Sequence, residues 1–76
     1  MAVVRVRYFA ALRERKGREE EDVELVPGET LGGLYRRLFP PGELPVAYAR
    51  NASTAGRDEV PEDGDEIVFL PPIGGG

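Results

Sequence analysis

The sequence predicts an α+β fold in which a mixed sheet of four or five strands packs on one main helix. Three observations predict it. The chain has 76 residues, which is enough for one small domain. Segments with the alternating pattern of strands come before and after one segment with helical spacing. The first and last strand-like segments are the most apolar, so we expect them to lie side by side and parallel at the centre of the sheet.

The first third of the chain predicts two strands joined by a helical turn. Residues 2–8 alternate apolar and cationic side chains, the pattern of a half-buried strand. Residues 9–16 have helical spacing and end at Gly17, a residue that favours the left-handed conformation of a helix C-cap. Residues 20–26 alternate aliphatic and acidic side chains and predict the second strand of a wide hairpin.

The main helix is expected over residues 30–39, with Thr30 as its N-cap. One helical stripe carries its apolar side chains, which are Leu31, Leu34, Tyr35 and Leu38. Gly32 and Gly33 lie early in this helix, and each costs up to about 1 kcal/mol relative to alanine. They indicate either close packing against the sheet or a later start of the helix.

The second half predicts the remaining strands. Residues 46–50 form a strand, residues 51–57 a loop, and residues 58–60 a brief edge strand. A turn over residues 61–64 precedes the last strand, residues 65–70, which is apolar on both faces and suits a central position or a second face that meets a partner. This order of elements is that of the β-grasp, or ubiquitin-like, fold.

Composition removes most catalytic chemistry. The chain has no cysteine and no histidine, and its formal net charge is −4. These absences exclude a disulfide framework, a thiolate metal site and the commonest general base. The acidic residues of segment 58–66 lack the spacing of a calcium loop, so we expect no metal and no cofactor bound by this chain. We also expect no nucleic-acid or membrane binding and a cytoplasmic location.

The C-terminal segment is the most informative part of the sequence. We expect a β-grasp domain over residues 1–70 and a flexible tail over residues 71–76. Pro71 and Pro72 favour an extended approach, and the chain then ends in glycines with a free carboxylate on Gly76. Such a thin tail fits a narrow channel where any Cβ would collide. The alternative is a frayed end or a cloning remnant.

Exposed apolar residues are expected near the root of this tail, if the first and last strands are neighbours. They would form a partner-binding patch of Phe9, Leu70, Pro71, Pro72 and Ile73. The alternative for Phe9 is a place in the core.

The sequence resembles the MoaD family, the small sulfur-carrying subunits of molybdopterin synthase. The resemblance covers nearly the whole chain. It rests on Val6–Glu14 (VRYFAALRE) with Gly17, on Leu25–Leu31 (LVPGETL), on Asp63–Ile67 (DGDEI) and on Phe69–Gly76 (FLPPIGGG). Gly74 stands where the family usually has serine, threonine or alanine. The Gly-Gly ending alone is not specific, because ubiquitin and the ThiS thiamine sulfur carriers share it.

The resemblance implies a mechanism and partners. An E1-like, MoeB-like adenylyltransferase would activate the Gly76 carboxylate with ATP and Mg²⁺, and a persulfide protein would supply the sulfur of a thiocarboxylate. The tail would then enter a MoaE-like large subunit and give sulfur to cyclic pyranopterin monophosphate, which builds the molybdopterin dithiolene. Gly74 and Gly75 would give steric access, and Phe9 and Leu70 would anchor the partner. This chain would be a sulfur-donating subunit that relies on the large subunit for acid and base groups.

Two other functions remain open from the sequence. A sulfur carrier can serve thiamine thiazole synthesis or tRNA thiolation, because the large partner sets the acceptor. A ubiquitin-like modifier would instead join Gly76 to lysines of target proteins.

Overall fold

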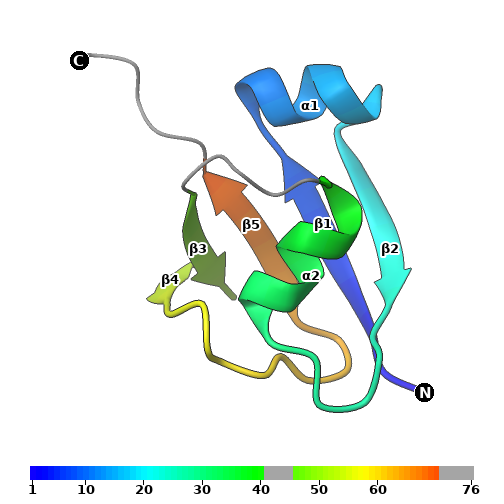
Figure 1. Cartoon of the computed structure of the whole chain (residues 1–76), viewed down its shortest axis with the longest axis vertical. Helices are drawn as coiled ribbons and strands as arrows, with labels where there is room; N and C mark the ends of the chain where they lie inside the picture. The colour runs from blue at the N-terminus through cyan, green and yellow to red at the C-terminus, as the bar shows by residue number, and fades with distance from the viewer. Residues whose placement is uncertain (41–45, 71–76) are drawn as a thin grey trace.

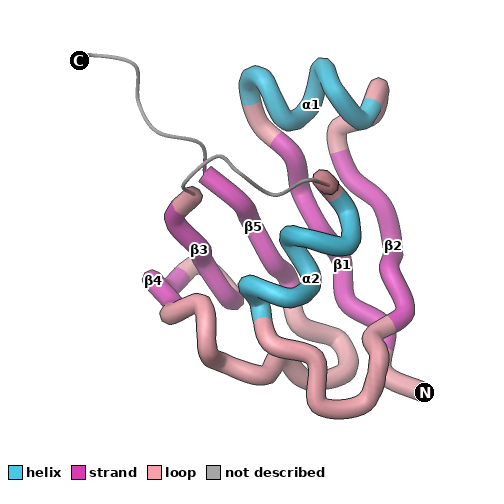
Figure 2. Tube along the Cα trace, viewed as in Figure 1, coloured by secondary structure: helices cyan, strands magenta, loops and turns pink. Residues whose placement is uncertain are grey.

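A computed structural model of the chain describes residues 1–40 and 46–70. The described elements are β1 (Val3–Tyr8), α1 (Ala10–Lys16), β2 (Glu20–Glu24), α2 (Leu31–Leu38), β3 (Ala47–Arg50), β4 (Ser53–Ala55) and β5 (Glu66–Leu70). They form a five-stranded sheet in the order β2-β1-β5-β3-β4, with α2 lying across one face (Figures 1 and 2). The expected α+β, ubiquitin-like β-grasp fold is confirmed. No helix of this described part is long and apolar enough to span a membrane.

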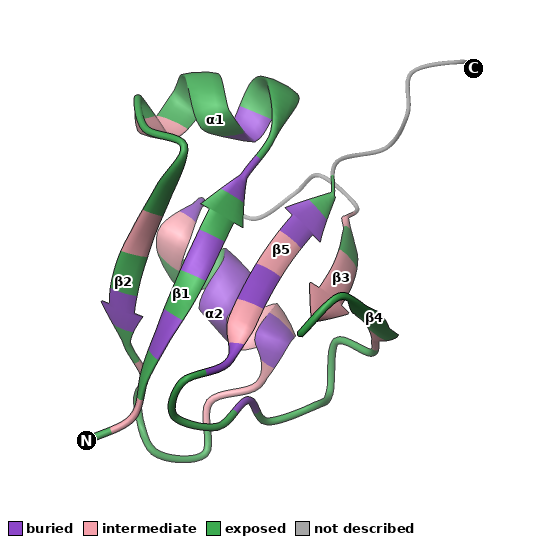
Figure 3. Ribbon diagram, turned by 180° about the vertical axis from the view of Figure 1, so that it is seen from behind, coloured by how far each residue is buried: buried purple, intermediate pink, exposed green. Residues whose placement is uncertain are grey.

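The two central strands are parallel, as expected. β1 pairs with β5 in parallel, and the register places Tyr8 opposite Phe69. β2 and β3 flank this pair in antiparallel orientation. Alternation along β1 buries Val4, Val6 and Tyr8 beneath α2 and leaves the cationic residues between them exposed on the other face (Figure 3). Neither helix covers that second face within the described residues, so the sheet has one core face and one open face.

The glycines early in α2 have a packing reason that differs from the expected one. Thr30 caps the helix by accepting a hydrogen bond from the Gly33 N–H at 3.1 Å. The Gly32 N–H donates to the Arg57 carbonyl oxygen at 2.9 Å, and a Cβ on Gly32 would lie 3.3 Å from that same oxygen. The closest contact is therefore with the loop before β5, whereas the hydroxyl of Tyr48 in β3 lies 3.8 Å from that Cβ position. The helix begins where it was expected.

The brief edge strand lies earlier than the sequence predicted. Residues 58–60 are not a strand, and β4 occupies Ser53–Ala55 inside the expected loop. The reason is a tight turn at Asn51 and Ala52, whose φ angles of 52° and 68° lie in the left-handed region and let β4 fold back onto β3. Asparagine tolerates this region but alanine does not favour it, so only one of the two residues indicates such a turn.

A carboxylate organises the loop before β5. Asp65 is 9% exposed and accepts hydrogen bonds from Arg50 Nε at 2.6 Å, Asn51 Nδ2 at 2.9 Å and the Glu62 N–H at 2.8 Å. The Glu62 N–H, then Asn51 and Arg50, hold the pKa of Asp65 below its ordinary value. Across residues 1–40 and 46–70, no group of carboxylates is arranged to hold a metal ion.

Aromatic residues fill the core beneath the carboxyl ends of β1 and β5. The Phe39 ring meets Tyr8 edge to face at 5.4 Å between centroids. Phe69 makes similar contacts with Tyr35 at 5.4 Å and with Tyr48 at 5.8 Å. Such edge-to-face pairs add about 0.5–1.5 kcal/mol each beyond the area that they bury. The carboxyl ends of the central strands therefore pack against a cluster of aromatic side chains.

Candidate functional site: the carboxyl ends of the central strands

Phe9 and Leu70 lie next to each other at the end of the sheet. The pairing of Tyr8 with Phe69 brings the next residue of each strand to the same level (Figures 1 and 3). Tyr8 and Phe69 are buried beneath α2, so alternation turns Phe9 and Leu70 to the open face. They are 40% and 41% exposed, so Phe9 is not a core residue.

The Phe9 ring has charged neighbours. Arg7 lies on the same face of β1, and its guanidinium carbon is 5.8 Å from the ring centroid. Arg7 Nε is 3.8 Å from a carboxylate oxygen of Glu20, and Arg13 is 3.7 Å from Glu19. These five residues line a small hollow of about 100 Å³ together with Tyr8. The alternating pattern of residues 2–8 did not predict this contact, although the i, i+2 spacing of Arg7 and Phe9 was a signal.

The backbone turns sharply directly after Phe9. Phe9 is extended, with φ −127° and ψ 154°, and caps α1 through its carbonyl oxygen, which accepts from the Leu12 N–H at 3.1 Å. Ala10 has a φ of 49°, in the left-handed region that costs an L-residue roughly 1–2 kcal/mol. Leu12 is fully buried and holds α1 against the core. The strained turn thus lets Leu12 point inward while Phe9 points outward.

The surface around Leu70 continues as an apolar strip across the open face. Leu70 pairs with Ala47 of β3, and Val68 pairs with Ala49 in the same ladder. All four side chains face away from α2, because Phe69 between them is buried. We call Phe9, Leu70, Val68, Ala47 and Ala49 the tail-end patch. Such a contiguous apolar patch with a charged border is typical of a protein-binding surface.

Tyr8, directly before Phe9, carries a titratable group beneath this surface. The buried Tyr8 hydroxyl donates to Glu21 at 2.5 Å. Burial, and then this hydrogen bond, raise the pKa of the Tyr8 phenol, so it stays protonated at neutral pH. The predicted reactive and tail residues, Pro71, Pro72, Ile73, Gly74, Gly75 and Gly76, lie outside the described residues. They follow directly after Leu70 in the sequence.

The comparisons with known proteins identify the family. Residues 6–76 match the model of the ThiS family. The chain belongs to the ThiS family. This ThiS-family protein is similar to a solved structure described as putative molybdopterin converting factor, subunit 1, from Pyrococcus furiosus. The two share 28% identity over 96% of this chain and 100% of the other, with a TM-score of 0.81.

Two further structures show how widely this fold is used. The small archaeal modifier protein 1 of Haloferax volcanii is 25% identical over 96% of this chain and 100% of its own, with a TM-score of 0.80. A chain in a complex of subunits 1 and 2 of the molybdopterin-converting factor from Helicobacter pylori is 24% identical, covers 97% and 99% of the two chains, and gives a TM-score of 0.60. At that identity the likeness shows the fold alone. The relation to the MoaD and ThiS proteins that the sequence predicted is confirmed, and this ThiS-family protein shares its ubiquitin-like fold with a molybdopterin converting factor subunit and with an archaeal modifier protein.

Proposed function

We propose that this protein is a sulfur carrier and the small subunit of a molybdopterin synthase, and that Gly76 carries the sulfur as a thiocarboxylate. The observation that carries the proposal is the position of Phe9 and Leu70. Both are exposed at the carboxyl ends of the central strands, and Leu70 immediately precedes residues 71–76 in the sequence. A partner that binds this patch receives the following residues in a defined direction. The 28% identity to a molybdopterin converting factor subunit supports the choice of pathway.

The chemistry takes place on the main-chain terminus, because the chain has no cysteine to hold sulfur. The Gly76 carboxylate attacks the α-phosphate of ATP in an E1-like adenylyltransferase, and pyrophosphate leaves. The terminal sulfur of a protein persulfide then attacks the acyl carbon and displaces AMP. This attack forms a carbon–sulfur bond and leaves an acyl disulfide that still contains the sulfur–sulfur bond of the persulfide. A second thiol of the donor cleaves that bond, which leaves a disulfide on the donor and a thiocarboxylate on Gly76.

The large subunit supplies the site for the second half of the reaction. Residues 71–76 enter it as the reactive arm, where Pro71 and Pro72 set the direction and Gly74 and Gly75 avoid steric collision. The thiocarboxylate sulfur attacks cyclic pyranopterin monophosphate, and a second charged carrier completes the dithiolene. ATP and Mg²⁺ belong to the activating enzyme, and the reaction takes place in the cytoplasm.

The test is reconstitution followed by intact-mass measurement. The chain is incubated with the adenylyltransferase, ATP, Mg²⁺ and a persulfide donor, and we expect one oxygen-to-sulfur exchange. Removal of Gly76, or addition of one residue after it, should abolish molybdopterin synthesis with the large subunit and leave the melting temperature unchanged. Unaltered synthesis by either variant would refute the mechanism.

A ubiquitin-like modifier is the second candidate, favoured by the similarity to a small archaeal modifier protein. The same mass measurement separates the two functions. If isopeptide adducts to lysines form without any thiocarboxylate, the protein is a modifier and the carrier proposal is wrong. Sulfur transfer to a thiamine thiazole precursor or to tRNA, and none to the pterin, would keep the carrier and change the pathway.

A further inference from the structure

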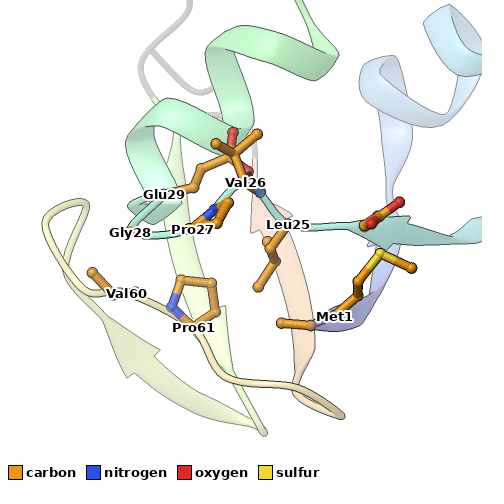
Figure 4. Close-up of a pocket in the computed structure, with 10 residues that line it drawn as sticks. Met1, Leu25, Val26, Pro27, Gly28, Glu29, Val60 and Pro61 are labelled. Carbon is orange, nitrogen blue, oxygen red and sulfur yellow. Dashed lines mark hydrogen bonds between the residues drawn. The ribbon is translucent and has the colours of Figure 1, made fainter.

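An apolar groove lies at the opposite end of the sheet. A groove of about 440 Å³ opens between the β2–α2 loop and the loop before β5. Leu25 and Pro61 face this space, with Val26 and Val60 beside them and Met1 on a third side (Figure 4). We call it the amino-end groove, because it lies where β1 and β5 begin. Six residues of β1 separate this end from Phe9, a span of roughly 20 Å.

Both walls of the groove are held by hydrogen bonds. In the first wall, the Glu29 N–H donates to the Val26 carbonyl oxygen at 2.9 Å, with Pro27 and Gly28 at the centre of the turn. Gly28 has a φ of 79°, as a type II turn requires at that position. The Glu29 carboxylate accepts from the Val26 N–H at 3.1 Å and pairs with Arg37 at 2.8 Å. This wall therefore keeps its shape without a ligand.

The second wall is tied to two neighbouring elements. The Glu59 carbonyl oxygen accepts from the Leu31 N–H at 2.9 Å, and the Gly64 N–H donates to the Val3 carbonyl oxygen at 2.8 Å. Asp63 accepts from the Val3 N–H at 2.8 Å. Between these anchors lies Val60, whose side chain is left in the open. A preformed groove binds at a lower entropic cost than one that must close around its ligand.

Apolar side chains on both walls remain exposed. Val26 is 54% exposed and Val60 is 48% exposed. Pro61 is buried and Leu25 is partly buried. The groove offers few free polar groups, because the Glu29 carboxylate already has partners in Arg37 and the Val26 N–H. A small polar ligand would find little to fix its orientation, whereas an inserted aliphatic side chain needs only the apolar walls.

The border of the groove is acidic. Glu24 and Glu29 line the groove, and Glu62 and Asp63 directly follow Pro61 of its second wall. Among the residues that the structure describes, no cation forms an ion pair with Glu24 or Asp63. The partly exposed Glu59 and the 81% exposed Glu62 share the single cation Arg50 with Asp65. This border attracts a cationic partner and repels a second copy of the same acidic surface.

We propose that the amino-end groove binds a segment of a partner protein that presents one large aliphatic side chain between arginine or lysine residues. The aliphatic side chain lies between Val26 and Val60, and the cationic residues meet the acidic border. The groove and the tail-end patch lie at opposite ends of the sheet, so one partner holds the groove while the other end of the protein stays accessible.

The test is a titration of the ¹⁵N-labelled chain with short blocked peptides, followed by amide chemical shifts. The probe has one central leucine between paired arginines, and its controls have serine for leucine or glutamate for arginine. We expect shifts at residues 24–29 and 60–63 with the probe alone, and binding that weakens several-fold when salt rises from roughly 0.05 to 0.5 M. Val60→Asp should weaken binding about tenfold or more. Thr54→Asp adds the same charge at an exposed position of similar size on β4 and should have little effect.

Other outcomes overturn the proposal. The proposal is wrong if the groove amides show no chemical-shift change at saturating probe, or if either control peptide causes shifts equal to those of the probe. It is also wrong if Val60→Asp binds the probe with unchanged affinity. If Val60→Asp fails to fold, Val26→Asp in the opposite wall replaces it, and the same loss of affinity is expected. Groove shifts that depend on the concentration of the free chain would assign the groove to a second copy instead.

Discussion

Replacement of Leu70 separates partner binding from folding. The side chain is 41% exposed, so a partner can bury about two-fifths of its surface. Full burial of a leucine side chain is worth about 1.5–3 kcal/mol. Leu70→Ala should therefore cost about 0.6–1.2 kcal/mol of binding free energy, which is roughly a three- to eightfold loss of affinity. Leu70→Glu also places an unpaired carboxylate in the interface at a cost of several kcal/mol, so we expect a loss of about a hundredfold or more.

Leu70→Glu should lower the free energy of unfolding by less than it lowers the binding free energy. About three-fifths of Leu70 is already covered in the free chain, which corresponds to at most about 2 kcal/mol by the same scale. Titration calorimetry with the large subunit and with the activating enzyme measures binding, and urea unfolding measures stability. Val3→Glu is the matched control, because Val3 is 38% exposed on the same open face at the far end of β1. Unchanged affinity of Leu70→Glu together with a larger loss of stability would refute the assignment of the tail-end patch.

Three further substitutions test the local reasoning. Asp65→Asn should lower the free energy of unfolding at neutral pH by about 2–4 kcal/mol, because three donors lose a charged acceptor. The folded-state pKa of Asp65 lies below its unfolded value, so its contribution is complete above about pH 4 and is lost as pH falls through the folded-state pKa. Urea unfolding across that range should show a shallower acid dependence for the variant, and an identical one would contradict this. Ala10→Gly should raise the free energy of unfolding by about 0.5–1 kcal/mol, because glycine relieves the strain of the positive φ at this position. Ala11→Gly, the control one residue later, should not raise the melting temperature. Tyr35→Phe should stabilise by about 1 kcal/mol, because the buried Tyr35 hydroxyl has no hydrogen-bond partner among the described residues; a lower melting temperature would reveal one.

Alternation and turn residues were enough to predict the main architecture. The pattern of β1 and the apolar β5 predicted the central parallel pair, because these strands carry the most side chains that need burial. The Thr30 cap and the apolar stripe predicted α2 for a similar reason. These signals lie within single elements of the sequence, and each of these elements forms as predicted.

The misplaced edge strand had no comparable local signal. β4 is three residues long and mostly exposed, so no apolar pattern marks it. Its position depends on the turn at Asn51 and Ala52, which is stabilised through contacts such as the Asn51 side chain on Asp65. Those contacts join residues far apart in the sequence, and spacing alone does not predict them.

The site was predictable in part. The neighbours Phe9 and Leu70 followed from the expected strand order, and their exposure agrees with a surface role. The amino-end groove was not predicted, because its walls come from two loops whose approach depends on the hydrogen bonds of Glu59 and Gly64. A pair of exposed valines in separate loops gives no pattern in the sequence.

The position of β5 determines how the domain responds to mechanical load. Any pull on the chain beyond Leu70 acts along β5, which is hydrogen-bonded to β1 on one side and to β3 on the other. Hydrogen bonds between strands run across the strand direction, so such a pull loads both ladders in shear, where many bonds must yield together. A partner can therefore draw the end of the chain tight without peeling β5 from the sheet. An edge strand in the same place would lack half of that resistance.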